Sequence, residues 1–454
     1  MPSIEAREPA RPLAAIQQEL DKCMRCGACM AVCPVYNAEK DEAAVARGKI
    51  GIAEAVVNGV LALDDQEVID TLFNCLVCKS CMQSCPTGVE FDRIMVGLRT
   101  AIVEKNGLPW LKAAIFGTLK QPDLMDDAMK IGAALKSLVF RDHPRLRAIS
   151  PRSPFTILGQ HTGLAANRLF PAPASNPLRS RVEEVVPAAG ATTRAAFFTG
   201  CSLHYFYPET GMDLIDVLSA NRVEVVIPRE QQCCGTPVLV HGDAQTARTL
   251  ARNNLDAMER SGAEYIITGC GSCGSAWQHT FPDLLRDDKS YCEKAARWAA
   301  KTYDVSTFLT QIVKYRPPAG RVDAVVTYHD SCHLKKSMKV AAEPRQLLGA
   351  IPGVMVKEMS RPDACCGGGG SYCLTHAATS SAIGASKAQD AARTGASILT
   401  TGCPACMMQL LDQSNRAGSK QRVRHYISLV AQSYRAENGD ASAVPGDEAD
   451  VSSL

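Results

Sequence analysis

The 454-residue sequence lacks several features that would place it in common protein classes. It has no uninterrupted apolar run of about 18 residues, so no transmembrane helix is predicted, and residues 1–12 lack the apolar segment of a signal peptide. We therefore expect a cytoplasmic protein, with peripheral contact to the inner face of the cytoplasmic membrane left open. A formal net charge of +2 without a strongly basic segment argues against nucleic acid as a partner. No Gly-x-Gly-x-x-Gly fingerprint follows a predicted strand, which argues against a dinucleotide site on this chain.

Cysteine, in contrast, is abundant, with 20 residues. Eight of them form two copies of the pattern Cys-x-x-Cys-x-x-Cys-x-x-x-Cys-Pro, which is the ligand run of a two-cluster bacterial ferredoxin. In that class the fourth cysteine of each run ligates the other cluster. The crossover assigns Cys23, Cys26, Cys29 and Cys85 to one [4Fe–4S] cubane cluster, and Cys75, Cys78, Cys81 and Cys33 to a second. Zinc sites and disulfides fit this spacing less well, so we expect a chain that transfers electrons.

Ten further cysteines form an internal repeat whose offset stays between 131 and 133 residues. The first set is Cys201, Cys233, Cys234, Cys270 and Cys273, and the second set is Cys332, Cys365, Cys366, Cys403 and Cys406. So constant an offset indicates a duplicated domain. Adjacent cysteines are a poor disulfide pair, and a zinc site would leave the fifth thiol unexplained, so the pattern favours an iron–sulfur cluster in each half.

Strand-like runs lead into these cysteines, and helical patterns lie between them. The predicted strands are 195–199, 265–268, 324–328 and 398–401, and the predicted helices include 244–260 and 380–393. Alternation of this kind predicts a parallel sheet in each half. Sites in such sheets gather beyond the carboxyl ends of the strands, so we expect the five thiols of each half to converge there.

The five-cysteine arrangement resembles the cysteine-rich CCG domain of heterodisulfide reductase catalytic subunits. That domain also occurs in the iron–sulfur subunits of glycolate oxidase, anaerobic glycerol-3-phosphate dehydrogenase and lactate-utilisation systems. A helical two-cluster ferredoxin followed by two CCG domains resembles most the glycolate oxidase iron–sulfur subunit family, as do the phrases Phe198-Thr199-Gly200-Cys201 and Arg47-Gly48-Lys49. Relatives usually have Arg-Gly-Arg at the latter, so Lys49 is a mild departure. The resemblance implies one or two further [4Fe–4S] clusters, of the noncubane type, at the two CCG motifs.

We therefore expect a multidomain α+β protein, with an α-helical ferredoxin domain followed by two duplicated α/β domains with parallel sheets. The expected domains are 1–106 for the ferredoxin, 107–193 for a helical connector and Pro/Ala-rich linker, 194–315 and 316–435 for the two CCG domains, and 436–454 for a disordered acidic tail. Residues 108–140 predict two amphipathic helices. We expect their apolar face to pack on the ferredoxin domain, with a membrane surface or membrane partner as the alternative.

Iron–sulfur clusters pass single electrons, whereas oxidation of a 2-hydroxy acid needs an acceptor such as flavin. The resemblance therefore implies an electron-transfer subunit that works with a separate FAD-containing 2-hydroxy-acid dehydrogenase subunit, acts on glycolate or D-lactate, and passes electrons to a quinone or another membrane-bound acceptor. Two alternatives stay open: a heterodisulfide-reductase-like enzyme that reduces a disulfide at a CCG-bound cluster, and an electron hub of a larger bifurcating complex. No catalytic residue is assigned. His204, His329 and His333 flank the leading cysteines and are expected to form hydrogen bonds around the clusters or in the core.

Overall fold

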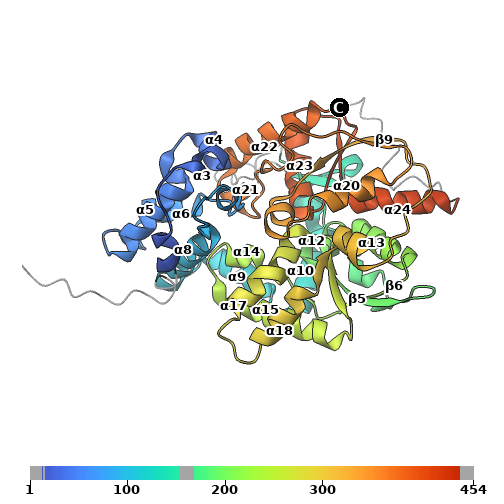
Figure 1. Ribbon diagram of the computed structural model, residues 1–454, viewed down its shortest axis with the longest axis horizontal. Helices are drawn as coiled ribbons and strands as arrows, with labels where there is room; N and C mark the ends of the chain where they lie inside the picture. Colours follow the sequence, from blue (N-terminus) through green and yellow to red (C-terminus); the bar gives the residue numbers. More distant parts are fainter. Residues whose placement is uncertain (1–12, 14–15, 153–167, 440–454) are drawn as a thin grey trace, which may run out of the picture.

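The computed structural model describes residue 13 and residues 16–152 and 168–439 of the chain. Figure 1 shows a lobe of short helices, in blue, beside a larger body in which helices surround the β-strands. The larger body contains two sheets with the same order of parallel strands. This architecture confirms the predicted fold class, a helical N-terminal domain followed by duplicated α/β repeats.

The N-terminal lobe, residues 16–106, consists of short helices joined by tight loops. They are α2 (Gln17–Asp21), α3 (Ala28–Val32), α4 (Pro34–Glu39), the 3-10 helix η1 (Glu42–Ala44), α5 (Ala46–Val57), α6 (Gln66–Phe73), α7 (Ser80–Gln83) and α8 (Phe91–Asn106). Helix α5 buries Ile50 and Ala53, which recur at helical spacing, in the same apolar cluster as Ile94 and Leu98 of α8. Cysteines of both runs pack against this apolar cluster, so α5 and α8 support both runs.

The connector that follows contains helices α9 (Trp110–Thr118) and α10 (Pro122–Val139) and a small antiparallel sheet of β1 (Phe140–His143), β2 (Ala148–Pro151) and β3 (Phe170–Pro171). The expectation that the apolar face of α9 packs on the ferredoxin domain is wrong for Phe116, the buried aromatic residue of that helix. Phe116 packs against Val238 and Leu250 of the first α/β repeat, whereas Trp110 remains 81% exposed. Among the described residues, no helix has both the length and the apolar character needed to cross a membrane.

The Pro- and Ala-rich segment is packed into the first repeat and is not a free linker. Leu178, in the 3-10 helix η3 (Leu178–Ser180), is fully buried in the main core. Strand β4 (Val185–Val186) then pairs antiparallel with β6 at the edge of the first sheet. At the other end of the chain, helix α24 ends at Glu437, and the tail from 440 onward, where disorder was expected, lies outside the described residues.

The two repeats share one sheet topology. The first sheet has the order β4-β6-β5-β7-β8 and the second has the order β10-β9-β11-β12. The strands are β5 (Thr193–Phe198), β6 (Val223–Val226), β7 (Tyr265–Thr268), β8 (Thr302–Asp304), β9 (Ala324–His329), β10 (Val354–Val356), β11 (Ile398–Thr401) and β12 (Arg422–His425). Apart from β4, all of these strands pair in parallel. The predicted strands therefore occur in the predicted places.

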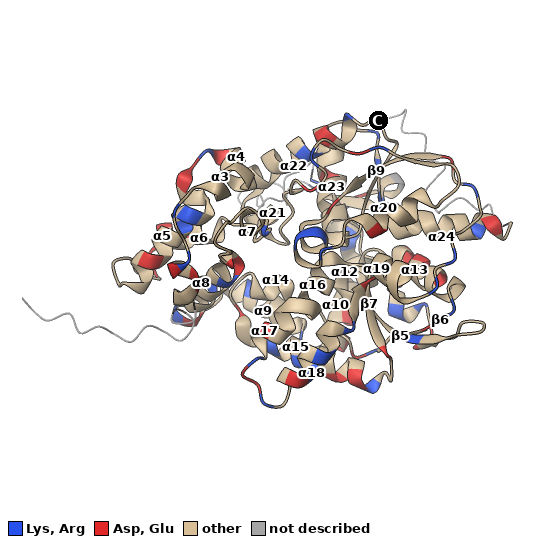
Figure 2. Cartoon of the chain, in the orientation of Figure 1, with Lys and Arg blue, Asp and Glu red and all other residues tan. Residues whose placement is uncertain are grey.

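Helices and helical turns connect the strands. In the first repeat they are α12 (Gly200–Tyr205), α13 (Pro208–Ala220), α14 (Thr236–Leu239), α15 (Ala244–Arg260), α16 (Gly271–Ser275), the π-helix η4 (Ala276–Thr280), α17 (Phe281–Leu284), α18 (Cys292–Ala300), α19 (Val305–Thr307) and the π-helix η5 (Phe308–Ile312). In the second they are the π-helix η6 (His333–Ser337), α20 (Ala342–Gly349), α21 (Tyr372–Thr375), α22 (Ala377–Ala392), α23 (Pro404–Arg416) and α24 (Tyr426–Glu437). Figure 2 shows cationic and anionic residues interspersed over these helices.

The two repeats pack through a common core. Buried apolar residues from both sheets belong to one cluster, and the Tyr426 hydroxyl donates a hydrogen bond to Asp304 Oδ1 across the repeats at 2.9 Å. The carboxyl end of β8, where Asp304 lies, therefore faces the start of α24. This packing brings the carboxyl ends of the two sheets toward one another.

Candidate metal centres

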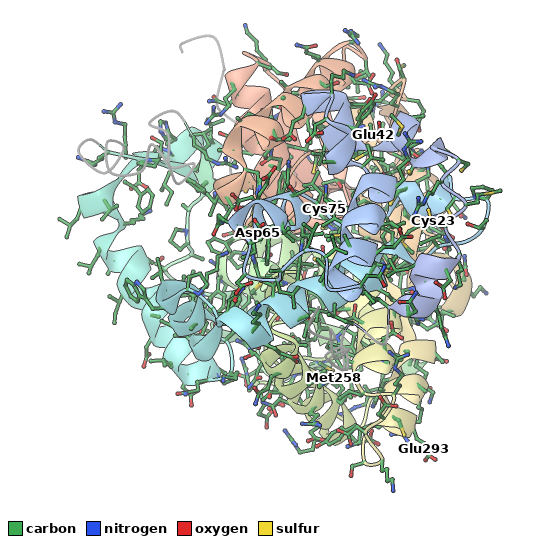
Figure 3. All side chains as sticks on the ribbon, turned by 90° about the vertical axis from the view of Figure 1, so that its left-hand side faces the viewer. Cys23, Glu42, Asp65, Cys75, Met258 and Glu293 are labelled. Carbon is green, nitrogen blue, oxygen red and sulfur yellow. The ribbon has the colours of Figure 1, made fainter. Side chains whose placement is uncertain are left out.

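The first ferredoxin-type group of thiols surrounds a small cavity of about 40 Å³ in the N-terminal lobe. Its lining includes Cys23, Cys26, Cys29 and Cys85, the four residues that the crossover assigns to one cluster. Cys26 is exposed, whereas the other three are partly buried. Figure 3 shows Cys23 at the outer side of this lobe. The first group therefore lies at the molecular surface.

The second ferredoxin-type group surrounds a cavity of about 30 Å³ that lies deeper in the molecule. Its lining includes Cys33, Cys75, Cys78 and Cys81. Cys81 also lines the first cavity, so the two groups are adjacent. Burial raises the pKa of Cys33 to about 11, and bound iron would offset that cost because metal ligation deprotonates a thiol. Four converging thiols at each cavity are the donor set that a cubane cluster requires.

Arg47, Gly48 and Lys49 place one cation beside each of these groups. The side chain of Arg47 lies beside Gly27 in the first cysteine run. Lys49 is fully buried, and its ammonium donates to the carbonyl oxygens of Ala43 and Ala44 at 3.2 and 2.6 Å. A Cβ on Gly48 would lie 2.3 Å from a backbone oxygen, so only glycine allows this close approach of the backbone. Burial lowers the pKa of Lys49, and the thiols of Cys75 and Cys33 act in the opposite direction.

The first α/β repeat gathers its five cysteines at the carboxyl ends of β5 and β7. Neighbouring thiols shift one another's pKa through side-chain hydrogen bonds, in the order Cys201, Cys233, Cys234, Cys273 and Cys270. A Cβ on Gly200, whose φ is +57°, would lie 2.8 Å from Cys273 Sγ. Glycine at this position therefore leaves space beside the thiols for a bulky inorganic group.

The second repeat gathers its cysteines in the corresponding place. The thiols of Cys365, Cys366, Cys406 and Cys403 shift one another's pKa through side-chain hydrogen bonds in that order, and Cys332 lies near enough to Cys366 and Cys403 for charge interaction. His329, at the end of β9, is also part of this site. A ring nitrogen of His329 and the sulfur atoms of Cys366 and Cys406 all lie within 4.8 Å of one another. The second site therefore contains a nitrogen donor as well as five thiols.

The four groups of thiols adjoin one another. Between the repeats, Cys270 Sγ lies 3.9 Å from Cys403 Sγ. Between the lobe and the second repeat, the thiol of Cys365 contacts that of Cys78 and is the main cause that lowers the Cys78 pKa to about 5. Ten thiols thus form one row, in the order Cys201, Cys233, Cys234, Cys273, Cys270, Cys403, Cys406, Cys366, Cys365 and Cys78.

Two lysine–serine pairs hold the lobe against the second repeat beside the Cys78–Cys365 contact. Lys336 Nζ of the repeat donates to Ser80 Oγ of the lobe at 2.6 Å. Lys79 Nζ of the lobe reaches Ser337 Oγ of the repeat at 3.4 Å. Sequence reasoning missed these residues, because a lone lysine or serine outside a motif carries no signal of a partner about 250 residues away.

Arg99 is a second residue that the sequence did not indicate. It is 3% exposed, donates to Val240 O of the first repeat at 2.7 Å, and donates to Cys75 O of the lobe at 2.9 Å. The same side chain therefore joins the backbone of a predicted ligand to the neighbouring repeat.

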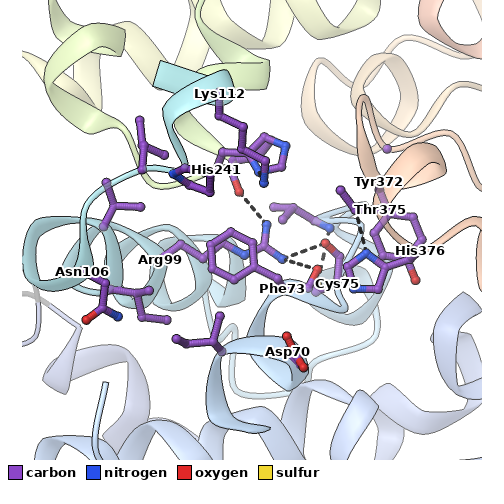
Figure 4. A pocket seen from close by; sticks show the side chains of 18 of the residues that line it. Asp70, Phe73, Cys75, Arg99, Asn106, Lys112, His241, Tyr372, Thr375 and His376 are labelled. Carbon is purple, nitrogen blue, oxygen red and sulfur yellow. Dashed lines mark hydrogen bonds between the residues drawn. The ribbon is translucent and has the colours of Figure 1, made fainter. Parts of the chain in front are cut away.

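A larger cavity of about 400 Å³ lies where the lobe, α9 and both repeats meet. Figure 4 shows it from close by, with Arg99, Lys112 and His241 on one side and Tyr372 and His376 on the other. His241 stacks on Phe73 with ring centroids 6.2 Å apart, and Tyr372 stacks on His376 at 4.6 Å. Cys75 also lines this cavity. A molecule bound there would lie against the second ferredoxin-type group.

The other two flanking histidines form hydrogen bonds in the core and between the repeats. His204 is buried, and its Nδ1 accepts a hydrogen bond from the backbone of Arg179 at 3.2 Å. His333 Nδ1 lies 3.3 Å from Ser272 Oγ of the other repeat. Outside the motifs, Cys292 begins α18 and the thiol of Cys373 donates to Gly370 O at 3.2 Å.

Comparisons with known proteins agree with these observations. A 4Fe-4S dicluster domain model matches residues 19–89, and a cysteine-rich domain model, CCG, matches residues 195–277 and 326–411. A probable glycolate oxidase iron–sulfur subunit of Bacillus subtilis is 31% identical over 91% of this chain and 93% of its own length. One subunit of the dihydromethanophenazine:CoB–CoM heterodisulfide reductase of Methanosarcina barkeri is 27% identical over 95% of this chain and 97% of its own length. Lactate utilization protein A of Halalkalibacterium halodurans is 28% identical over 52% of this chain and 96% of its own length. With its iron–sulfur ligand sets and its similarity along nearly the whole chain, the protein belongs to the glycolate oxidase iron–sulfur subunit family.

Proposed function

We propose that this chain is the electron-transfer subunit of a dehydrogenase in which a separate FAD-containing subunit oxidises glycolate or D-lactate. The observation that carries the proposal is the row of ten thiols from Cys201 to Cys78, which continues into the two ferredoxin-type groups. The cubane clusters at the ferredoxin groups and the further clusters at the CCG motifs would supply one-electron transfer. The names of the glycolate oxidase and lactate utilization relatives support the substrate class.

Residues of this chain define where electrons enter and how the thiol groups are held next to one another. The first ferredoxin group, with exposed Cys26, is the place where electrons from a partner enter. Lys336 and Lys79 hold the second ferredoxin group against the second repeat, and Arg99 holds it against the first. These contacts fix the separation between groups, which controls electron transfer.

The proposal is tested anaerobically with the iron-loaded chain and its co-purified flavoprotein partner. Glycolate or D-lactate should bleach the iron–sulfur absorbance only when the partner is present. Cys26→Ser should abolish transfer from the flavin to an added acceptor, while Cys292→Ser, outside every thiol group, should leave it unchanged. Oxidation of either substrate by the isolated chain would show the subunit model to be wrong.

For the acceptor, the cavity of Figure 4 fits a quinone headgroup. Apolar Ile69 and Val103 line it together with the stacked pair Tyr372 and His376, whose polar atoms suit a quinone carbonyl, and it reaches Cys75. A Thr375→Trp change at its exposed rim should slow quinone reduction several-fold and leave reduction of a small inorganic oxidant unchanged. Equal loss with both oxidants, or loss with neither, would place the quinone elsewhere.

A disulfide reductase is the second candidate, favoured by the direct contact of two complete five-thiol sites at Cys270 and Cys403. The similarity to the heterodisulfide reductase of Methanosarcina barkeri supports it. Reduced viologen would then drive turnover of a small-molecule disulfide without any flavoprotein. Absence of such turnover in fully iron-loaded protein would exclude this candidate.

A further inference from the structure

The two repeats differ at one buried position beside their thiols. Strand β5 ends at Phe198 and strand β9 ends at His329, each three residues before the leading cysteine of its motif. In the sheets, Phe198 pairs with Thr268 and His329 pairs with Thr401, which are themselves corresponding residues of β7 and β11. The two positions are therefore equivalent, and only the side chains differ.

In the first repeat this position is apolar. Phe198 is fully buried in the same cluster as Cys234 and Cys273. It stands edge-on to Trp277, with ring centroids 5.5 Å apart and an interplanar angle of 77°. The side chain has no polar atom to offer to the neighbouring thiols.

In the second repeat the same position offers a nitrogen. His329 is 1% exposed, and its Nε2 forms no regular hydrogen bond among the described residues, where its neighbour is the thiol of Cys366. Its ring lies beside Cys366 and Cys406, within the 4.8 Å grouping described above. A thiol is only a weak donor and loses its proton when it ligates a metal, so iron bound by Cys366 would leave this buried nitrogen without a donor and free to bind.

The hydrogen bond of the other ring nitrogen decides which form the imidazole takes. Nδ1 of His329 lies 3.2 Å from the carbonyl oxygen of Pro362. A carbonyl oxygen only accepts, so Nδ1 carries a proton, and Nε2 is the ring nitrogen that can present a lone pair toward the thiols. Lys387 Nζ donates to the same carbonyl at 3.0 Å and helps to hold it in place. Metal-bound histidines are oriented by this kind of outer hydrogen bond.

We propose that Nε2 of His329 is a sixth donor at the second CCG-type site, where it ligates iron beside Cys366 and Cys406. The inference rests on the proposed function only in that it assumes an iron–sulfur cluster at this site. Imidazole is neutral, so the second site would keep the charge set by its five thiolates and gain a nitrogen donor. The first site lacks this donor, because its equivalent residue is Phe198. The two sites would therefore differ in coordination and in reduction potential.

The test uses full-length, iron-loaded protein labelled with ¹⁵N-histidine and reduced stepwise with dithionite. Pulsed EPR of the second site should show a strongly coupled ¹⁵N nucleus, and His329→Phe, which installs the residue of the first repeat, should remove it. In the same variant, the midpoint potential of the second site should change while the iron content is retained. Absence of a strongly coupled nitrogen in the wild-type protein, or its persistence in His329→Phe, would overturn the assignment.

His333→Ser is the matched control, because Ser202 occupies the corresponding position of the first repeat. The His333→Ser variant should keep the signal of the coupled nitrogen. If the signal is lost in His333→Ser but kept in His329→Phe, the ligand is His333 and the proposal is wrong. The wild-type spectrum tests the proposal even if a variant fails to fold. These measurements use neither substrate nor flavin, so their failure is separate from failure of the dehydrogenase assay.

Discussion

Replacement of Gly242 by Ala tests how the ferredoxin lobe docks on the first repeat. The φ angle of Gly242 is +89°, and a Cβ there would lie 2.2 Å from Arg99 O and 2.8 Å from Val103 Cγ2, both on α8. The left-handed backbone costs a residue with a Cβ about 1–2 kcal/mol. Forcing α8 away from the loop adds about 1–3 kcal/mol, as overpacking does elsewhere. We therefore expect Gly242→Ala to lower the free energy of unfolding by about 2–5 kcal/mol.

Gly262→Ala is the matched control for this experiment. Gly262 also has a positive φ, +64°, but its Cβ would meet no described atom within 4 Å, so this change carries only the backbone cost of about 1–2 kcal/mol. Urea unfolding of the iron-loaded variants, followed by far-UV circular dichroism, measures both losses. Gly242→Ala should also slow reduction of the CCG-type sites through the lobe. Equal destabilisation by the two changes would refute the docking contact between Gly242 and α8.

Three further outcomes are expected. Lys49→Met removes a buried cation beside Cys33 and Cys75. A redox titration should therefore show that the midpoint potential of the second ferredoxin group is lowered by on the order of 50 mV. Arg47→Gln should instead lower the midpoint potential of the first group. Burial and the neighbouring Arg179 lower the pKa of His204 from 6.5 to about 3, so the unfolded chain binds a proton below pH 6.5 that the folded chain does not. This stabilisation is complete above pH 6.5 and is lost as the pH falls toward 3, by up to about 1.4 kcal/mol per pH unit. His204→Gln should therefore flatten the fall in unfolding free energy between pH 6.5 and about 4, and an unchanged slope would contradict the assignment. Anaerobic chelation of iron should lower the melting temperature, because iron joins thiols from separate segments, and an unchanged melting temperature would contradict ligation by those thiols.

Much of each candidate site could be predicted because its spacing is local. Three cysteines at intervals of three residues are held together by one short turn, as at Cys23, Cys26 and Cys29, whatever the rest of the chain does. The strand before a cysteine likewise places it at the carboxyl end of a parallel sheet, which is where Cys270 lies after β7. Periodicity and duplication therefore sufficed for the fold class and for the grouping of thiols within each repeat.

Other features depend on surfaces that meet only after folding. The amphipathic pattern of α9 predicts a buried face but does not say which partner covers it, and Phe116 packs on the first repeat. The composition of the Pro- and Ala-rich segment predicts a linker, yet the edge of the first sheet offers unpaired backbone groups that β4 satisfies. The secondary-structure propensity of the segment does not indicate this pairing, because the partner strand β6 is distant in the sequence.

The sequence by itself determined that this chain carries iron–sulfur ligands, how they divide into motifs, and that one domain is duplicated. Only the tertiary structure decided that Cys78 adjoins Cys365, that Cys403 adjoins Cys270, and that a ring nitrogen of His329 lies beside Cys366 and Cys406. The physical reason is the separation along the sequence of the residues that interact. Ligand spacing within a motif follows from local backbone geometry, whereas adjacency between motifs follows from packing between surfaces encoded more than 100 residues apart.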